Sequence, residues 1–301
     1  MTTFNVIGQP ADRVDGPQKV TGEAQYTADI QLPGTLWGKI LRSPYPFAEI
    51  VSIDASQAKA LPGVHAVLTG SDVQGVLYGR RLRDVPALAQ DVVRFIGEPV
   101  AAVAAETEDI ANEALEFIDV HYKELRPTLD PFEAMKDDAP ILHPDLDTYP
   151  GLPEPLGKPT NAFVRNAWDK GDPEIGFAEA DAIIEREYTT PMVHQAYLEP
   201  YSCLVWIDDD NRVQVWASNK APFALRGQLS DALGIPVEDI LLNQTYIGGD
   251  FGGKGSPLNV PLCYFLAKAS GRPVRMVMNY LEEFMAANPR HASTITMKTG
   301  V

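Results

Sequence analysis

Short apolar runs alternate with helix-like repeats between residues 42 and 122, which is typical of a mixed α/β unit. Residues 100–104 are all valine or alanine, as in a strand that is buried on both faces. We predict a helix next, because Thr107 can cap its start and apolar side chains recur on one face over 110–118. The period then changes from helix to strand, and a second strand is predicted over 118–122.

The same alternation returns in the second half of the chain. Strands and helices are predicted in turn at residues 213–217, 225–233, 240–246, 262–269 and 274–278. Gly234 and Gly271 follow the two helices as stop signals. A glycine cluster directly follows residues 240–246 and therefore lies in a strand-to-helix turn. The predicted fold class is α/β, in the broader α+β sense.

Prolines recur throughout residues 127–159 and prevent a long helix or a central strand there. We therefore predict an N-terminal domain with its arm over 1–130, a Pro-rich linker over 131–160, and the first part of a second domain over 161–301. A surface excursion within a single domain would explain these prolines equally well.

Composition restricts the possible functions. At 301 residues with 45% hydrophobic side chains, the chain can bury two ordinary cores. Its formal net charge of −16 repels polyphosphates and anionic headgroups, which argues against binding to nucleic acid or to a membrane. No apolar run reaches membrane-spanning length, and residues 1–5 lack the features of a signal peptide. We therefore expect a cytoplasmic protein.

The metal-ligating side chains are few. Cys203 and Cys263 are the only cysteines, too few for an iron–sulfur cluster or a four-cysteine zinc site within this chain. Both lie in apolar stretches, so we predict inert core thiols in a reducing compartment. His194 is predicted to be structural, and the other histidines lack ligand spacing. We expect no side chain of this chain to ligate a metal.

The most informative motif is the glycine cluster at 248–255, Gly-Gly-Asp-Phe-Gly-Gly-Lys-Gly. Such a turn lets the backbone approach a ligand closely and present several N–H groups to it. It also comes near the spacing of a nucleotide-binding P-loop, but Gly255 replaces the hydroxyl that would hold magnesium. Asp250 would moreover place a carboxylate among phosphates. A third interpretation is a turn that only lets neighbouring elements pack closely.

The cluster resembles the Gly-Gly-x-Phe-Gly-Gly-Lys signature of the xanthine dehydrogenase and aldehyde oxidase family, with Asp250 where a third glycine is usual. Further segments resemble, in collinear order, the N-terminal part of that family's molybdopterin-binding large subunit. These segments are residues 13–16, 19–22, 26–30, 41–44, 97–104, 122–125, 198–200 and 216–218. The resemblance implies an α/β hammerhead domain over 1–130, followed after the linker by the first portion of a molybdopterin-binding domain.

The resemblance also implies cofactor-binding residues. In such enzymes the Phe-Gly pair lies over the molybdenum centre, which selects Phe251 and Gly252 here. Gly248, Gly249 and Gly253 would shape the loop. An aromatic ring there excludes water and can stack on a planar substrate.

Besides Asp250, two further positions depart from the family pattern. Many relatives have a glutamine after a Ser-Thr pair, where it bonds a molybdenum oxo group, but this chain has Ser218-Asn219-Lys220. Lys220 could donate to that oxo group or point to solvent, and both alternatives stay open. Xanthine-oxidising relatives often have a glutamate after the signature lysine, and Gly255 in its place argues against purine specificity.

The general-base glutamate of this family comes near the far end of its chains, beyond Val301. Glu199, Glu282 and Glu283 do not match that motif and are predicted to be surface or structural carboxylates. We therefore expect no catalytic residue in this chain, and a molybdopterin cofactor shared with a second molybdopterin-binding chain.

The implied function is a subunit of a molybdenum hydroxylase that hydroxylates a small molecule, an aldehyde or an N-heterocycle. Partner subunits would carry the iron–sulfur clusters and FAD. The alternatives are a non-catalytic scaffold or assembly module of such a complex, a truncated fragment, and, less favoured, a P-loop-like nucleotide binder.

Overall fold

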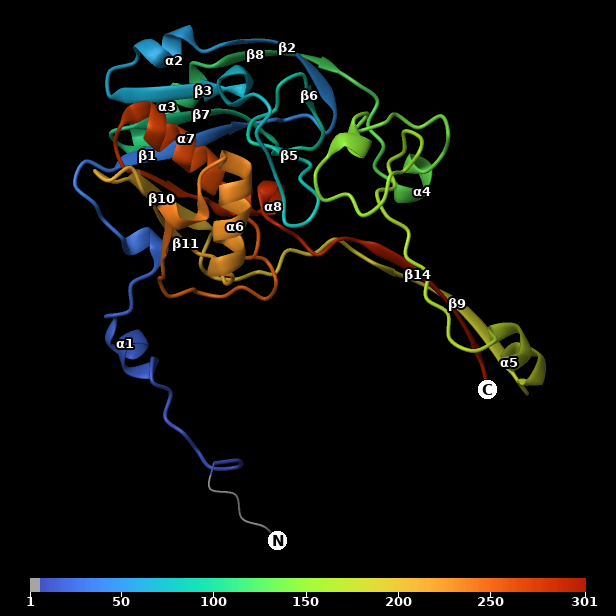
Figure 1. The fold of residues 1–301 in the computed structure, drawn as a ribbon. Helices are drawn as coiled ribbons and strands as arrows, with labels where there is room; N and C mark the ends of the chain where they lie inside the picture. The colour runs from blue at the N-terminus through green and yellow to red at the C-terminus, as the bar shows by residue number, and fades with distance from the viewer. Residues whose placement is uncertain (1–5) are drawn as a thin grey trace.

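A seven-stranded mixed sheet forms the centre of the molecule in a computed structural model that describes residues 6–301 (Figure 1). In spatial order its strands are β12 (Ile240–Asn243), β11 (Val213–Ala217), β10 (Ser202–Ile207), β13 (Val274–Val277), β1 (Leu36–Arg42), β7 (Pro99–Ala105) and β3 (Val64–Thr69). Neighbours are antiparallel, except that β1 runs parallel to β13 and β11 parallel to β12. Because β1 pairs with β13, one sheet joins strands from both predicted domains, and the boundaries at 130 and 160 stay a prediction.

Side chains of β7 point alternately into two different cores, which shows that the sheet is covered on both faces. Ala102 and Ala104 contact the larger core, to which helix α7 (Val260–Ser270) contributes. Val103 and the residues two positions before and after it contact a second core, to which α2 (Ser56–Ala60) and α3 (Glu108–Glu116) contribute. All seven residues of β7 are buried, as the apolar run predicted.

Smaller elements surround this sheet. A three-stranded sheet has the order β6 (Val92–Val93), β2 (Ala48–Asp54), β8 (Asp119–Glu124), and β4 (Leu77–Tyr78) pairs with β5 (Val85–Pro86). The remaining helices are α1 (Gly16–Thr21), α4 (Pro131–Ala134), α5 (Pro173–Glu179), α6 (Pro222–Leu233) and α8 (Tyr280–Ala286). Short 3₁₀ turns lie at Thr27–Asp29, Gly70–Val73, Leu146–Thr148 and Val237–Asp239.

The predicted alternation of strands and helices is confirmed. The side chain of Thr107 caps α3 by accepting from the amide of Ile110. Gly234 and Gly271 end α6 and α7 in left-handed conformations. The strand expected over 240–246 is shorter, because β12 pairs with β11 only to Asn243. Beyond that point the chain turns to the N-terminal arm, where Tyr246 bridges to Tyr26.

The Pro-rich stretch is tied to the body through main-chain groups. The guanidinium of Arg94 donates to the carbonyl of Leu142 at 2.9 Å, and the amide of Arg83 donates to the carbonyl of Pro150 at 2.9 Å. Asn161 closes the stretch on itself, since its side-chain amide donates to the carbonyls of Ala134 and Pro140. These bonds order a segment that has little secondary structure of its own.

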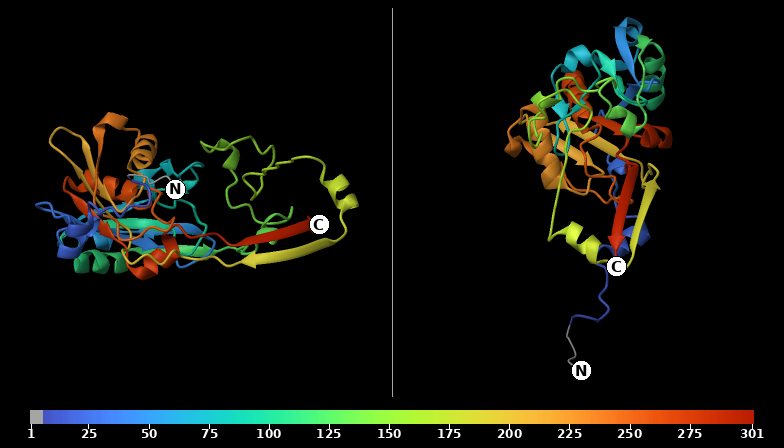
Figure 2. Two further views of the ribbon diagram at one scale, coloured as in Figure 1. Left: turned by 90° about the horizontal axis from the view of Figure 1, so that it is seen from below. Right: turned by 90° about the vertical axis from the view of Figure 1, so that its right-hand side faces the viewer.

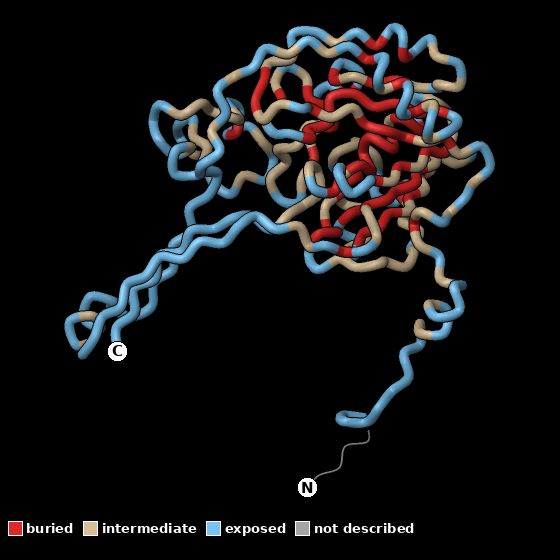
Figure 3. The backbone as a smooth tube through the Cα atoms, turned by 180° about the vertical axis from the view of Figure 1, so that it is seen from behind, coloured by how far each residue is buried: buried red, intermediate tan, exposed pale blue. Residues whose placement is uncertain are grey.

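A two-stranded antiparallel ribbon of β9 (Ile183–Thr190) and β14 (Ser293–Gly300) extends away from the body, with α5 near its tip (Figures 1 and 2). Every residue of both strands is exposed, whereas the buried residues concentrate in the body (Figure 3).

Two further sequence expectations concern the start of the chain and its two cysteines. The expectation that the chain has no signal peptide falls on residues 1–5, which lie outside the described part of the chain. Cys203 and Cys263 are both buried free thiols, as predicted. Within residues 6–301, no helix combines the length and the apolar character needed to cross a bilayer.

Candidate functional site

The glycine cluster forms the connection between β12 and α7 and contains a tight turn at Asp250 to Gly253. The amide of Gly253 donates to the carbonyl of Asp250 at 2.8 Å and closes the turn. Both central residues have positive φ, +44° at Phe251 and +101° at Gly252, which is the sign pattern of a type I′ turn. Phe251 is 65% exposed, although its ring edge lies close to Gly249. It is therefore no ordinary core aromatic.

The carboxylate of Asp250 folds back into the loop. Its two oxygens accept from the amides of Gly252, at 3.0 Å, and Lys254, at 2.6 Å. Oδ2 also accepts from the ammonium of Lys220 at 2.7 Å. Partial burial opposes ionisation, but these hydrogen bonds outweigh it and hold the pKa of Asp250 below its ordinary value.

Lys220 thus lies at the loop, through its ion pair with Asp250. Its own amide also donates to the carbonyl of Lys254 at 3.0 Å, so main chain and side chain contact the loop together. Beside it is a cavity of about 120 Å³ whose lining includes Asn219, Leu225, Asn243 and Gln244. Whether Lys220 contacts a cofactor stays a prediction.

A buried layer under the loop explains three of its glycines. A Cβ added at Gly253 would lie 2.6 Å from Cε1 of Tyr197, and one at Gly249 would lie 2.9 Å from Cβ of the same tyrosine. At Gly248 it would lie 2.6 Å from Cβ of Glu199. Close packing therefore requires glycine at these positions. At Gly252, by contrast, only a guanidinium nitrogen at 3.8 Å is near.

The signature lysine belongs to this buried layer. Lys254 is fully buried, donates to Oε2 of Glu199 at 2.5 Å, and lies 4.6 Å from the centroid of the Tyr197 ring. Oε2 of Glu199 also accepts from the amide of Gly248 at 2.7 Å, so one carboxylate links the lysine to the start of the loop. Lys254 cannot reach a ligand on the open side, which removes the P-loop interpretation.

A second buried carboxylate, Glu283 on α8, anchors the tyrosine. It accepts from the hydroxyl of Tyr197 at 2.6 Å and from the amide of Tyr201. Burial, reinforced by the bond to Glu283, raises the pKa of Tyr197. His194 lies 3.3 Å from Glu283 and is structural, as predicted. Reasoning from the sequence did not predict the role of Tyr197, since the only signal nearby was the Leu198-Glu199-Pro200 segment.

The loop contains backbone amides that have no partner within the described residues. Within residues 6–301, no acceptor is found for the backbone N–H groups of Gly249, Asp250 and Phe251, whereas those of Gly248, Gly252, Gly253 and Lys254 are bonded internally. Consecutive free amides beside positive-φ residues form an environment that favours oxygen-rich or anionic groups. In the same part of the chain, no three His, Cys, Asp or Glu side chains gather as metal ligands.

Two family models match the chain. They are the molybdopterin cofactor-binding domain over residues 156–301 and the aldehyde oxidase and xanthine dehydrogenase a/b hammerhead domain over residues 21–126. Together they cover the body of the molecule, the ribbon and the glycine loop.

Known proteins agree with these models. The chain is 39% identical over 298 residues to a probable xanthine dehydrogenase subunit of Bacillus subtilis, covering 98% of this chain and 38% of that protein. It is 32% identical to the nicotinate dehydrogenase large molybdopterin subunit of Eubacterium barkeri, covering 99% of this chain and 67% of that protein. The solved Cu,Mo-CO dehydrogenase superposes with a TM-score of 0.88 at 31% identity, over 98% of this chain and 38% of that chain.

The fold and the family models therefore define a chain that carries a molybdopterin cofactor-binding domain. It belongs to the xanthine dehydrogenase and aldehyde oxidase family of molybdenum hydroxylases, whose members are oxidoreductases. The loop fits the cofactor of this family, because three free amides and the open side of Gly252 leave room and donors for an oxygen-rich group.

Proposed function

We propose that this chain forms one wall of the molybdopterin and substrate pocket of a molybdenum hydroxylase, with Phe251 and Gly252 facing the cofactor. The exposed ring of Phe251, held on a turn with a rigid buried floor, is the observation that carries the proposal. When bound, the cofactor supplies the redox chemistry and water-derived oxygen. Gly248, Gly249 and Gly253 shape the loop, and the free amides of 249–251 bind oxygen atoms of the ligand.

The ring of Phe251 has two roles in this proposal. It excludes water from the open side of the loop, and it provides a face on which a planar substrate can stack. The substrate class is an aldehyde or an N-heterocycle, and Gly255 argues against a purine. The general base and the remainder of the pocket come from protein outside these 301 residues, which span 38% of the Bacillus relative.

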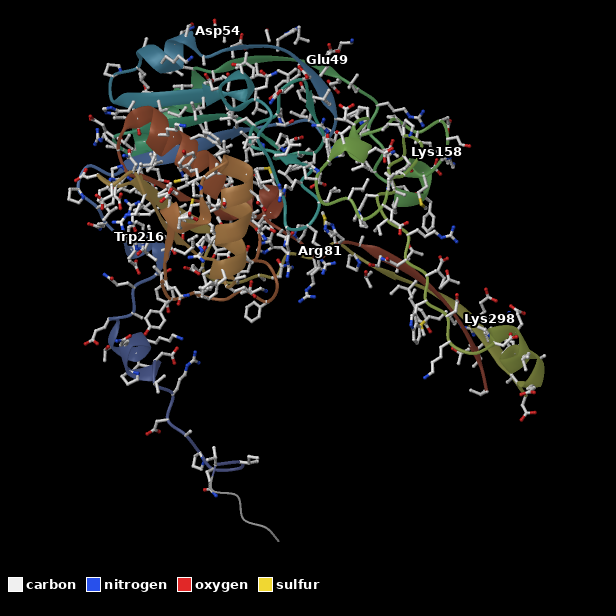
Figure 4. The ribbon with its side chains drawn as sticks, in the orientation of Figure 1. Glu49, Asp54, Arg81, Lys158, Trp216 and Lys298 are labelled. Carbon is white, nitrogen blue, oxygen red and sulfur yellow. The ribbon has the colours of Figure 1, made fainter. Side chains whose placement is uncertain are left out.

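The ribbon supports the need for a further protein surface. Its pairing puts Ile184, Tyr188, Ile295 and Met297 on one face, and all four are between 44% and 53% exposed. The opposite face is mostly polar, with Ile183 as an exposed apolar residue, and there Nζ of Lys298 lies 4.5 Å from the centroid of the Phe177 ring of α5 (Figure 4). A lone ribbon of two strands is only marginally stable, so the uncovered apolar face indicates packing against other protein.

We propose that a second molybdopterin-binding chain, or chain segment, covers this face, and that iron–sulfur and FAD subunits carry the electrons away. The complex would reside in the cytoplasm.

Replacing Phe251 by alanine in the molybdenum-containing complex tests the proposal. We expect turnover to fall on the order of tenfold or more, because the substrate loses its orienting face, while the molybdenum content is retained. Phe132→Ala is the matched control, since Phe132 is also exposed, at 54%, but lies in the Pro-rich stretch. Equal turnover of the Phe251 variant and the parent complex would reject the pocket role in favour of a scaffold.

A further inference from the structure

Phe251 occupies a backbone conformation that its side chain disfavours. Its φ of +44° lies in the left-handed region, which costs a residue with a Cβ about 1–2 kcal/mol. Asparagine, aspartate or glycine is the usual choice at this position of a turn with two positive φ values. Because the residue is 65% exposed, burial of its ring can offset only part of this cost. Other residues must therefore hold the turn.

Three hydrogen bonds hold the turn, in addition to the main-chain bond that closes it. The carboxylate of Asp250 accepts from the amides of Gly252 and Lys254, one bond to each oxygen, and so clamps the chain on the C-terminal side of Phe251. The guanidinium of Arg290 donates to the carbonyl of Phe251 at 2.9 Å. Arg290 is itself fixed, because its main chain exchanges two hydrogen bonds with Val193, at 2.8 and 3.0 Å.

We propose that Asp250 and Arg290 are positioning residues that hold Phe251 outward before any ligand binds, so that the pocket wall is pre-organised. The role of this arrangement in the pocket rests on the proposed function. The ordering of the loop itself is a property of the chain alone. Strain that neighbouring groups maintain in this way is found where geometry serves function.

Lys220 has a separate role in this arrangement. A carboxylate beside three free amides would repel an anionic group, and the ammonium of Lys220, 2.7 Å from Oδ2, compensates its charge. Within residues 6–301, the ammonium of Lys220 bonds to this carboxylate alone. The ion pair thus sets the charge of the loop, whereas the carboxylate itself sets its shape.

Amide hydrogen exchange of the full chain, followed by mass spectrometry on a peptide spanning 249–256, tests the proposal without cofactor. In Asp250→Ala we expect the amides of 252 and 254 to exchange about tenfold faster or more, the factor that one hydrogen bond to a charged acceptor supplies. Asp250→Asn keeps one oxygen acceptor and should be intermediate. Arg290→Met should also accelerate exchange in this peptide, with protection of α7 unchanged.

Lys220→Met is the matched control, because it removes the ion pair and leaves both amide bonds in place. We expect exchange within about threefold of the parent chain, since exposed ion pairs contribute little. A double variant that exchanges the two charges, Lys220→Asp with Asp250→Lys, should not restore protection. Restoration by this swap, or unchanged exchange in both Asp250→Ala and Asp250→Asn, would overturn the proposal.

The assembled complex separates this inference from the proposed function. If both hold, Asp250→Asn lowers kcat more than it changes KM at constant molybdenum content. Faster exchange with unaltered turnover in both Asp250→Asn and Phe251→Ala would leave the positioning role standing and reject the pocket role. Unaltered exchange in the Asp250 variants together with lost turnover in Phe251→Ala would reject the positioning role and leave the pocket role standing.

Discussion

Gly253→Ala is the sharpest test of the packing under the loop. The added methyl would lie 2.6 Å from Cε1 of Tyr197, whereas carbon atoms in contact are separated by about 3.5–4.0 Å. About 1 Å of movement is therefore needed. Tyr197 cannot supply it easily, because the residue is 1% exposed and its hydroxyl is bound to Glu283 at 2.6 Å.

The expected loss of stability follows from two opposing terms. Overpacking a rigid buried site costs about 1–3 kcal/mol. The methyl also restricts the unfolded chain, which favours the folded state by about 0.4–1 kcal/mol. Because Gly253 has no positive φ, no backbone strain is added. We expect a net decrease of about 1–2 kcal/mol in the free energy of unfolding.

Gly227→Ala is the matched control. Gly227 lies inside α6 with nothing within 4 Å of an added Cβ, so the same substitution should stabilise the chain by about 0.5–1 kcal/mol. Urea denaturation of both variants and the parent chain measures these changes. A Gly253→Ala variant as stable as the parent, or one that shifts in the same direction as Gly227→Ala, would refute a rigid floor under the loop.

Three further predictions concern other parts of the molecule. Glu283→Ala leaves two buried donors without an acceptor and should lower the free energy of unfolding by about 2–5 kcal/mol. Tyr197→Phe should lower it by only about 1 kcal/mol. Equal losses of the two variants in urea denaturation would contradict this prediction. Burial lowers the pKa of His143 to about 4, so protons are taken up on unfolding, and stability should fall as the pH is lowered from about 6.5 to 4. His143→Gln should remove that part of the pH profile. Ile295→Lys should leave the chain's own stability within about 0.5 kcal/mol but weaken co-purification with the other molybdopterin-binding chain, whereas Thr296→Lys on the polar face should not.

The fold could be predicted wherever a local pattern decides the structure. The apolar run of β7 is buried because both faces of that strand are covered, and Thr107 caps α3 by a bond between residues three apart. Gly234 and Gly271 end their helices for an equally local reason. The pairing of β1 with β13 could not be predicted in this way, because Leu36 and Val274 meet only in the folded chain.

In the candidate site, too, local features could be predicted from the sequence and long-range contacts could not. The position of the loop between a strand and a helix was predictable from periodicity, and the family signature selected Phe251. Its supports were not predictable, since Arg290 and Glu283 reach the site from elements that follow it in the chain. Neither residue has a sequence motif of its own that indicates the contact.

Asp250 and Lys220 show how two residues that are unexpected when considered separately can be explained by one contact. Considered separately, a carboxylate in a glycine loop argues against an anionic ligand, and a lysine in place of a glutamine has no defined partner. The structure brings them within 2.7 Å, so each accounts for the other: the lysine compensates the charge that the aspartate introduces, and the aspartate orients the lysine. Because the aspartate also bonds the amides of 252 and 254, replacing Lys220 alone should alter the charge at the loop but not its shape, whereas replacing Asp250 alters both.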